Sequence, residues 1–462
     1  MHVYDGTYNE NVIITKNGLS VIAASSPVLD GTGLGTSGFL LMADHIQING
    51  FTIQNFMSPT AGIAGIELRG ANHCWLHHNE MKNNNYGIVF GDSTMTTYPS
   101  NDYNLIEYNS IHNNNPSSPW YYTGIGIMYW YGTSSHTTVY MNEIYDHDRN
   151  AILAGQHERY NPDSVGYGGH SYWQIIKNNI GHSGWYAIEI TNGLYSVIQE
   201  NTVTNAGIGI LVQAWDYSAH HILVDKNEIQ NSGTGIYLVT QNTTKLPLTT
   251  LGNINVTNNK IYSCTSYGVN TWSTSTAQIS NCIISNNIVH DTGSIGMYLI
   301  NLQDSTVKYN NVYKINHVGL YLASCDNTYI RYNEVYNCTY SGIQLLNTAS
   351  SRAEHNTVYY NGYSGIYVHN GCTNILVKSN NVHDNCIGSL AGTAGIKVIS
   401  DGTTLEYNLI ENNKLDGLYV TSDNNIILRN TILGNTGAYS GIHLTNTADG
   451  NEIHYNCIVG NT

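Results

Sequence analysis

The chain has 462 residues, of which 11% are charged, and its 32 acidic side chains outnumber 17 basic ones to give a formal net charge of -15. Such an acidic chain is a poor partner for nucleic acid, and it has no apolar run of the roughly 20 residues that a membrane span requires. Because 41% of the residues are hydrophobic and they are regularly spaced, an intrinsically disordered chain is also excluded.

The chain repeats one short pattern from its beginning to its end. The marker of this pattern is a triplet of Asn, any residue and an aliphatic residue, which recurs every 22 to 36 residues. An aliphatic segment such as 426–429 precedes each marker, and a phrase of Gly, aliphatic, any residue and Leu or Val, such as 365–368, follows most of them. In chain order the marker asparagines are Asn79, Asn109, Asn142, Asn178, Asn201, Asn227, Asn259, Asn286, Asn310, Asn333, Asn356, Asn380, Asn408, Asn430 and Asn456, with a looser copy at Asn49.

Each period therefore contains three short segments in which apolar and polar residues alternate. Alternation with period two over three to five residues indicates strands and not helices. Three strands leave too little chain for a covering helix, so each strand must pair in parallel with its copy one period away. The sequence predicts an all-β parallel β-helix with three sheets and about sixteen to seventeen coils, in which the marker asparagines turn inward and stack as a ladder.

We expect residues 1–462 to form one solenoid domain, with a loop-rich half at about 79–255 and a regular half of short coils at about 256–462. The chain begins and ends within strand phrases, and no secretion signal precedes the first of them. We therefore expect an excerpt of a longer chain, whose open ends would allow end-to-end self-association or the attachment of flanking domains. The longer excursions fall at 91–104, 113–123, 131–137, 155–172 and 240–252.

The eight cysteines do not share a register in adjacent coils. Because a disulfide needs Cα atoms about 5 Å apart, we expect unpaired cysteines that act as small apolar residues inside the stack.

Strand alternation turns the third position of the Gly phrase outward. Five tyrosines at this position would form a stripe on one face, where aromatic rings stack on sugars and phenol groups bond to sugar hydroxyls. The stripe predicts a polysaccharide partner, and cross-strand stacking of the tyrosines for stability is the alternative. In chain order this position is occupied by Val89, Met128, Leu153, Glu189, Leu211, Tyr237, Asn270, Tyr298, Tyr321, Gln344, Tyr367, Lys397, Tyr419 and His443.

A polar cluster in the loop-rich half is the candidate catalytic site. Asp146 and His182 each lie four residues after a marker, which places them one coil apart, at about 5 Å. A carboxylate orients a neighbouring imidazole. Arg149 would neutralise the carboxylate of a uronate sugar, and a His or Tyr would remove its C5 proton. Another group would then return a proton or assist the leaving oxygen. The candidate catalytic residues are Tyr145, Asp146, His147, Asp148, Arg149, His182 and Glu189, and Tyr186 is a candidate sugar-binding residue beside them.

Two other interpretations of this cluster stay open. Asp146 or Asp148 could pair with Glu189 for glycoside hydrolysis. Alternatively, the His-Asp pairs at 290–291 and 383–384 occur near the same register in coils without long loops, which favours turn formation over catalysis.

The spacing of potential ligands predicts no metal or cofactor. Calcium is the alternative, because it binds to clustered carboxylates. The densest group of candidate ligands consists of Asp146, Asp148 and Glu158.

The segments 3–12 (Val-Tyr-Asp-Gly-Thr-Tyr-Asn-Glu-Asn-Val) and 43–53 resemble phrases of right-handed parallel β-helix proteins of the carbohydrate-binding and sugar-hydrolase (NosD-like) class, which are related in fold to pectate lyases and mannuronan C5-epimerases. The resemblance covers essentially the whole chain and implies a right-handed coil and an extracellular or cell-surface location. The run at 145–149 is similar to the Asp-Pro-His-Asp motif of the epimerases, although it lacks the proline.

The resemblance implies an extracellular polysaccharide-binding protein with lyase or C5-epimerase chemistry in a groove that the long excursions wall around Glu189. The alternative is a non-catalytic adhesive module of a cell surface, or a filament subunit that assembles through its open ends.

Overall fold

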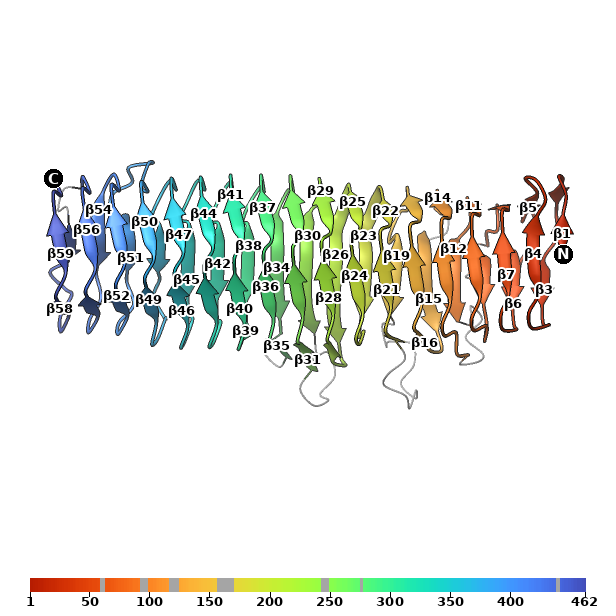
Figure 1. Ribbon diagram of the computed structural model, residues 1–462, viewed down its shortest axis with the longest axis horizontal. Coiled ribbons are helices and arrows are strands. Elements are labelled where there is room, and N and C mark those ends of the chain that lie inside the picture. Colours follow the sequence, from red (N-terminus) through yellow and green to blue (C-terminus); the bar gives the residue numbers. More distant parts are fainter. Residues whose placement is uncertain are drawn as a thin grey trace. The chain divides into compact units, whose positions relative to one another are not determined.

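The computed structural model describes residues 1–58, 63–91, 99–115, 124–155, 170–241, 249–274, 277–437 and 441–462. In this part of the chain the regular secondary structure consists of short β-strands (Figure 1), and no helix there is long and apolar enough to cross a membrane. The chain divides into two compact units, which are Met1–Ser232 with Gln241–Leu251, and Gly233–Thr240 with Gly252–Thr462. In each unit, every coil contributes one strand to each of three parallel sheets.

The first sheet contains the strands that precede the marker asparagines. In the first unit they are β1 His2–Val3, β4 Ser20–Ala23, β7 Gln47–Asn49, β10 Trp75–His77, β13 Leu105–Glu107, β17 Thr138–Tyr140, β21 Gln174–Ile176, β24 Val197–Gln199 and β28 Leu223–Asp225. In the second unit they are β32 Asn255–Thr257, β36 Ile283–Ser285, β40 Thr306–Lys308, β43 Tyr329–Arg331, β46 Arg352–Glu354, β49 Leu376–Lys378, β52 Thr404–Glu406, β55 Ile426–Leu428 and β58 Glu452–His454.

The second sheet contains the strands that follow the markers. In the first unit they are β2 Thr7–Tyr8, β5 Val28–Asp30, β8 Thr52–Gln54, β11 Glu80–Lys82, β14 Ser110–His112, β18 Glu143–Tyr145, β22 Asn179–Ile180, β25 Thr202–Thr204 and β29 Glu228–Gln230. In the second unit they are β33 Lys260–Tyr262, β37 Ile288–His290, β41 Asn311–Tyr313, β44 Glu334–Tyr336, β47 Thr357–Tyr359, β50 Asn381–His383, β53 Leu409–Glu411, β56 Thr431–Leu433 and β59 Cys457–Val459.

The third sheet contains the strands of the Gly phrases. In the first unit they are β3 Val12–Ile14, β6 Phe39–Leu41, β9 Ala64–Leu68, β12 Tyr86–Gly91, β15 Ile125–Tyr131, β19 Ile152–Gly155, β23 Ser183–Thr191 and β26 Ala206–Trp215. In the second unit they are β30 Thr234–Gln241, β34 Tyr267–Ser273, β38 Met297–Ile300, β42 Leu320–Ala323, β45 Ile343–Leu346, β48 Ile366–Val368, β51 Ala394–Val398, β54 Asp416–Val420 and β57 Ile442–Leu444. The remaining strands are β16 Ser134–Ser135, β20 His170–Ser171, β27 Ala219–His220, β31 Thr249–Gly252, β35 Ala277–Ser280 and β39 Leu302–Gln303.

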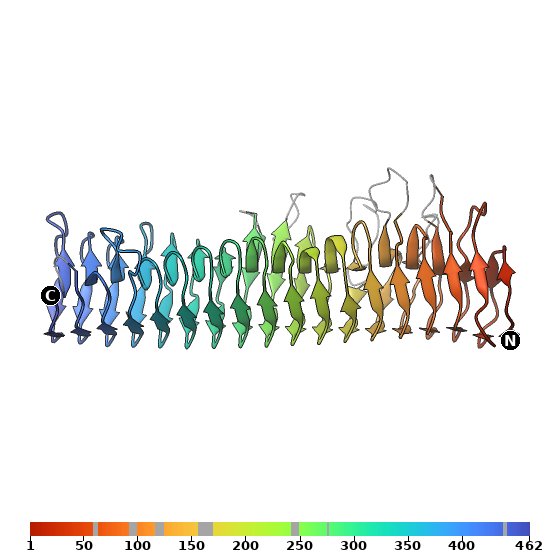
Figure 2. The same cartoon turned by 90° about the horizontal axis from the view of Figure 1, so that it is seen from above.

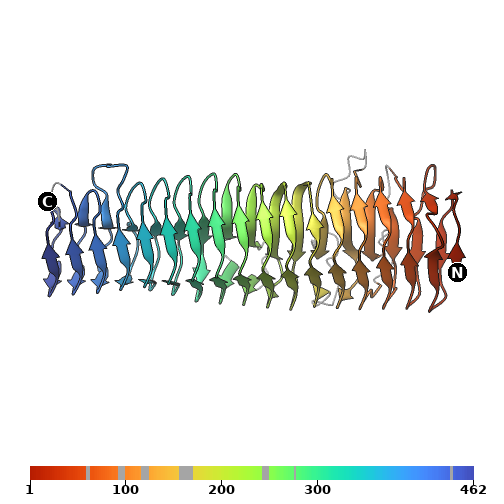
Figure 3. The same cartoon turned by 45° about the horizontal axis from the view of Figure 1, so that its top comes forward.

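The middle residue of most three-residue strands points into the coil, where it contacts its equivalents above and below. Val307 pairs with Ile330, which pairs with Ala353 and so on to Val377, and all four side chains are fully buried. Figures 2 and 3 show the successive coils of each unit side by side, with their strands parallel. The predicted three-sheet parallel β-helix is therefore confirmed in both units.

The predicted asparagine ladder is also confirmed. The Nδ2 of Asn310 donates to Oδ1 of Asn333 at 2.9 Å, and Asn333 donates to Asn356 at 3.0 Å. The same Oδ1 atom accepts the backbone N–H of the preceding ladder residue at 3.0 Å, so each carboxamide satisfies buried backbone groups as well as its neighbour.

Two marker positions were predicted incorrectly. Asn287, and not Asn286, lies in the ladder, because Asn259 donates to Asn287 and Asn287 donates to Asn310, both at 3.0 Å. Asn49 lies at the end of β7 and pairs with His77, while Phe51 occupies the ladder position and its N–H donates to Asn79.

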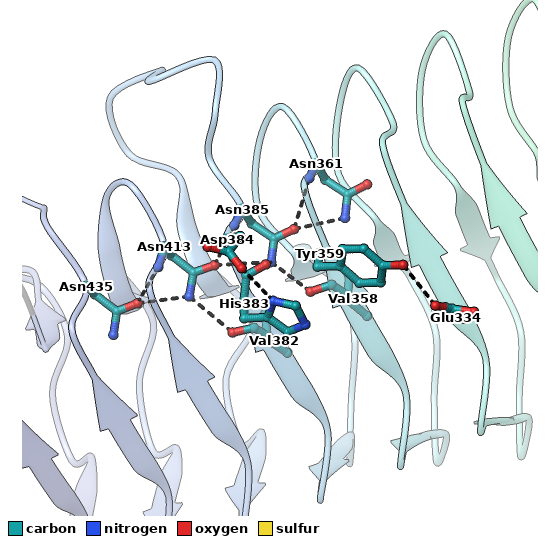
Figure 4. Close-up of polar contacts among 10 residues, drawn as sticks. All are labelled: Glu334, Val358, Tyr359, Asn361, Val382, His383, Asp384, Asn385, Asn413 and Asn435. Carbon is teal, nitrogen blue, oxygen red and sulfur yellow. Dashed lines mark hydrogen bonds and ion pairs between the residues drawn. The ribbon is translucent and has the colours of Figure 1, made fainter.

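A second asparagine ladder, not predicted from the sequence, lies at the corner between the second and third strands. Each of its asparagines follows a residue of the first ladder by five positions. In the second unit Asn361 donates to Asn385 at 2.9 Å, Asn385 to Asn413 at 3.1 Å and Asn413 to Asn435 at 2.9 Å (Figure 4). In the first unit the backbone N–H of Asn84 donates to Oδ1 of Asn114 at 3.0 Å, and its Nδ2 donates to the carbonyl oxygen of Ile53 at 3.1 Å. Both ladders fix the coil register from within.

Candidate functional site

The outward positions of the third sheet in the second unit form one continuous row, which we call the tyrosine row. Each residue of the row pairs in register with the next across adjacent strands from β30 to β57, and each is half-buried. The structure thus brings the five predicted tyrosines to one face. The members of the row are Tyr237, Asn270, Tyr298, Tyr321, Gln344, Tyr367, Lys397, Tyr419 and His443.

The tyrosines of this row do not form a flat stack. The Tyr298 and Tyr321 rings lie 5.2 Å apart between centroids and are tilted by 51°, while Asn270, Gln344 and Lys397 separate the other tyrosines of the row. Burial raises the pKa of Tyr298, Tyr321 and Tyr367. These phenols are therefore neutral at pH 7 and can both donate and accept hydrogen bonds.

Flat stacking for stability does occur, but on the second sheet. Tyr313, Tyr336 and Tyr359 stack with centroids 5.1 and 4.8 Å apart and interplanar angles of 7° and 4°, and His383 continues the stack at 5.0 Å. Tyr359, seen in Figure 4, also donates to the Glu334 carboxylate at 2.9 Å. Those rings cover one another's faces, whereas the two adjacent tyrosines of the tyrosine row, Tyr298 and Tyr321, are tilted and Tyr298 stacks on Tyr267 instead.

A group of ionisable side chains interrupts the row near its C-terminal end. The Lys397 ammonium lies 4.9 Å from the Tyr367 ring and 5.6 Å from the Tyr419 ring, and burial lowers its pKa. The next member, His443, lies edge-on to Tyr419 at 4.7 Å, and its Nδ1 is 3.1 Å from Oδ2 of Asp416. The Gly phrase predicts Lys397 and His443 as outward positions but not as binding residues. A charged residue at an outward position among tyrosines is the signal that could have identified Lys397.

The predicted pairing of Asp146 with His182 is present at an exposed corner between the second and third sheets. Asp146 Oδ1 lies 3.8 Å from Nδ1 of His182, and the two side chains are 51% and 61% exposed. Both groups are therefore accessible to a polymer from solvent.

His147 lies inside the coil. It is completely buried, and its Nε2 is 3.2 Å from the carbonyl oxygen of Ile111. Burial lowers the pKa of His147 to about 4, so the ring is neutral at pH 7. Asn84 and Asn114, respectively two coils and one coil earlier in the same register, donate to the carbonyl oxygens of Ile53 and Met81 in the same way. His147 thus takes the place of a second-ladder asparagine.

The other residues of the candidate catalytic run have separate partners. Tyr145 stacks on His112 with centroids 4.7 Å apart and planes within 2°. The Arg149 guanidinium lies 4.2 Å from the Trp185 ring, and Asp148 is exposed, with its backbone N–H bonded to Asn115.

Glu189 lies on the outer face of the third sheet and is only 2% exposed. Its carboxylate accepts hydrogen bonds from Asn150 at 2.6 Å, from Gln213 at 2.7 Å and from Thr191 at 2.8 Å. Tyr186 lies half-buried on the same strand, and its pKa is raised by burial and by the charge of Glu189. These contacts hold Glu189 in a polar network on the sheet, whereas the Asp146–His182 pair lies at the corner.

The outward positions of the first unit are not open. Val89, Met128, Leu153 and Leu211 are buried, and the first three belong to an apolar cluster outside the coil core. These outward positions are therefore covered and not accessible to solvent. Most of the predicted long excursions, including Glu158, lie outside the described residues.

The predicted unpaired cysteines are confirmed. All eight cysteines are free, and seven are buried, with Cys457 exposed. Burial raises the pKa of Cys74 to about 11 and that of Cys325 to about 12, so these thiols are protonated at neutral pH.

Two family models match the sequence. The right-handed β-helix region model matches residues 132–284 and 215–382, and the model described as "Periplasmic copper-binding protein (NosD)" matches residues 5–172 and 337–462. No curated protein matches this chain in sequence.

The copper in the family description can be tested against the side chains present. Copper takes imidazole nitrogen and soft sulfur ligands. Among the residues that the structure describes, no three His, Cys, Asp or Glu side chains are grouped to hold a metal ion, and most of the thiols are buried and protonated. These residues do not fit a copper centre, and no chemical step is assigned to one.

Several solved structures are similar to this chain at low identity. The A-module of a mannuronan C-5 epimerase from Azotobacter vinelandii is 12% identical, with a TM-score of 0.43 over 70% of this chain and 89% of its own. A periplasmic alginate epimerase is 12% identical (TM-score 0.39, 93% and 84% covered), and pectate lyase Pel9A is 11% identical (TM-score 0.37, 69% and 81% covered). Each family model matches more than half of the chain, and both units contain three parallel sheets. The chain therefore belongs to the NosD family of right-handed parallel β-helix proteins.

Proposed function

We propose that this protein is an extracellular polysaccharide-binding β-helix that holds an extended glycan along the tyrosine row. The observation that carries the proposal is the unbroken register of half-buried, uncharged hydrogen-bonding and aromatic side chains from Tyr237 to Tyr367. Sugar rings present apolar faces and hydroxyl edges, which phenol rings and carboxamides complement. A row with one side chain per coil suits a linear polymer that runs along the sheet normal to its strands.

The proposal is tested by measuring glycan affinity of single variants in the row. Tyr321→Ala and Tyr298→Ala should each weaken binding by about tenfold, since an aromatic contact contributes roughly 0.5–1.5 kcal/mol and each 1.4 kcal/mol is tenfold. Titration calorimetry with a panel of neutral and acidic polysaccharides measures this.

The matched control is Tyr332→Ala. Tyr332 is 44% exposed at the corner between the first and second sheets, where it stacks on Tyr309 and His355. Equal affinities of the row variants and this control, or of the row variants and the wild-type protein, would contradict the proposal.

A second candidate function, uronate lyase or C5-epimerase activity, is favoured by the exposed Asp146–His182 pair. In this scheme His182 removes the C5 proton of a uronate, and Asp146 orients the imidazole and stabilises its protonated form. The electron pair left at C5 then either expels the C4 oxygen, which takes a proton from water, or takes a proton from water on the opposite ring face. Arg149 would neutralise the uronate carboxylate, whereas Glu189, which is 2% exposed within its own network, takes no part in this scheme.

Incubation with a panel of uronate polymers, followed by ultraviolet absorbance of unsaturated product and by the C5 epimer ratio, tests this second function. Asp146→Asn and His182→Ala should each remove turnover, whereas Asp291→Asn should not, although Asp291 lies 2.6 Å from Nδ1 of His290 in a similar corner pair. Absence of turnover in the wild-type protein with glycan binding retained would leave a non-catalytic surface module.

A further inference from the structure

Lys397 is the only lysine or arginine in the tyrosine row, and it lies between two aromatic rings. In register it pairs with Tyr367 on one side and Tyr419 on the other. Its ammonium is 4.9 Å from the first ring centroid and 5.6 Å from the second. The two rings therefore hold the ammonium at the surface of the sheet, in the line that the proposed glycan would follow.

Within the described part of the chain, no carboxylate forms an ion pair with Lys397. Other lysines of the outer surface do have such partners, as Lys378 lies 2.7 Å from Glu406 and Lys82 lies 2.8 Å from Glu80. Asp416, which lies on the neighbouring strand β54, has its Oδ2 3.1 Å from Nδ1 of His443. Lys397 differs from these lysines in being half-buried without a compensating negative charge.

A half-buried ammonium without an anion is unfavourable, because burial removes water and the ring faces of tyrosine compensate only part of the charge. None of the other members of the row is acidic, so an anion placed on the row meets no like charge there. The whole chain, with Lys397 included, has a formal net charge of -15, which disfavours the binding of a polyanion elsewhere. Lys397 is thus a local anion-binding position on an otherwise acidic molecule.

We propose that Lys397 is the anion-binding residue of the tyrosine row and that the glycan bound there is an acidic polysaccharide. A sugar carboxylate lies against the Lys397 ammonium, while the sugar rings on either side lie on Tyr367 and Tyr419. This inference rests on the proposed glycan-binding function and adds the substrate class to it.

The test compares polymers that share a backbone and differ in charge. Polygalacturonate is paired with its methyl ester, and carboxymethyl cellulose with hydroxyethyl cellulose. The wild-type protein should bind at least one acidic member about tenfold more tightly than its neutral partner, because the neutral polymer cannot form a charge-assisted hydrogen bond with Lys397. Added salt should reduce this difference in affinity. Lys397→Gln should abolish the difference, and Lys397→Arg should retain it.

Lys378→Gln is the matched control, because Lys378 also lies over a tyrosine ring, that of Tyr407, but belongs to the first sheet. The control should leave the preference for the acidic polymer unchanged. Urea unfolding of each variant verifies that the fold is retained.

Two results overturn the inference. One is a wild-type protein without preference for the acidic member of either pair, and the other is an undiminished preference in Lys397→Gln. The proposed function fails separately, when Tyr298→Ala and Tyr321→Ala leave the affinity for every polymer unchanged. Tyrosine variants that weaken binding to charged and neutral polymers alike, together with an unaffected Lys397→Gln, would retain the glycan-binding row and reject its anion-binding residue.

Discussion

The ladder asparagine of each coil satisfies groups on both of its neighbours, and Asn178 illustrates this at the scale of one residue. Its Oδ1 accepts from the backbone and side chain of Asn142, both at 3.0 Å, and its Nδ2 donates to Val139 at 2.9 Å and to Asn201 at 3.0 Å. The side chain is 1% exposed. Removing it would leave several buried polar groups without partners.

We expect Asn178→Ala to lower the free energy of unfolding by about 2–5 kcal/mol, since each unsatisfied buried polar group costs roughly 1–3 kcal/mol. Asn179→Ala is the control, because Asn179 is exposed at the start of β22, and it should change stability by less than about 0.5 kcal/mol. Urea unfolding followed by circular dichroism measures both. Similar values for the two variants would show that the ladder contributes little.

His147 makes stability depend on pH. Its folded pKa of about 4 lies below the ordinary value of 6.5, so the unfolded chain binds a proton at higher pH than the folded protein does. The contribution of His147 to the free energy of unfolding is fully present above pH 6.5. As the pH falls from 6.5 towards 4, this contribution is lost, by up to about 3 kcal/mol. The loss is complete below the folded pKa.

His147→Asn should remove this pH dependence and retain the fold, because Asn84 and Asn114 occupy the same register. Unfolding midpoints of the variant and the wild-type protein, measured between pH 4 and pH 7, make the comparison. A variant with the same pH profile as the wild-type protein would show that other groups cause it.

Residue identity alone could predict the ladder but not every position in it. At 286–289 the sequence is Asn-Asn-Ile-Val, so either asparagine is followed two residues later by an aliphatic residue, and only pairing with Asn259 and Asn310 resolves the choice. The inward orientation of His147 was beyond prediction for a related reason. Its run contains charged residues on both sides, and the corner that turns it inward has no period-two signal.

At the scale of one element, the Gly phrase of the third sheet owes its glycine to close approach between coils. A Cβ on Gly342 would lie 2.8 Å from the Gly365 carbonyl oxygen and from Nδ2 of Asn361, and closer still to Val358. The second ladder and the third sheet therefore meet at this glycine. The same close approach to the next glycine carbonyl and to a second-ladder Nδ2 recurs at Gly365, Gly395 and Gly417.

We expect Gly342→Ala to destabilise the protein by about 1–3 kcal/mol or more, the usual effect of overpacking. Gly35→Ala is the matched control, because no atom lies within 4 Å of its added Cβ, and it should be neutral or slightly stabilising through the unfolded state. Thermal unfolding of both variants tests the expectation, and a neutral Gly342→Ala would contradict it.

Strand alternation predicted which residues of the third sheet face outward, but it could not predict what covers them. The tyrosine row is half-buried as expected, whereas the apolar residues Val89, Met128 and Leu153 at the same position are buried. Their apolar character was the available signal. The candidate site could be predicted as far as the tyrosine row and the Asp146–His182 pair, because both follow from register alone.

At the scale of the whole molecule, the eight free thiols report on the integrity of the coils. In the native protein a thiol reagent such as 5,5′-dithiobis(2-nitrobenzoic acid) should label one cysteine rapidly, Cys457, because the other seven are buried and the thiolate is the reactive form. In urea all eight should react. Cys457→Ser should remove the rapid phase, and several rapidly labelled thiols in the native protein would contradict the burial of the coil interior.

The asparagine ladder has the same geometry whatever the length of chain between its members. Asn142 donates to Asn178 across 36 residues at 3.0 Å, and Asn408 donates to Asn430 across 22 residues at 2.9 Å. A gene that duplicates or loses one complete period would therefore leave every remaining asparagine with an equivalent acceptor. Proteins of this type can change length during evolution by whole turns, and the ligand-binding length of a sheet face would change with them.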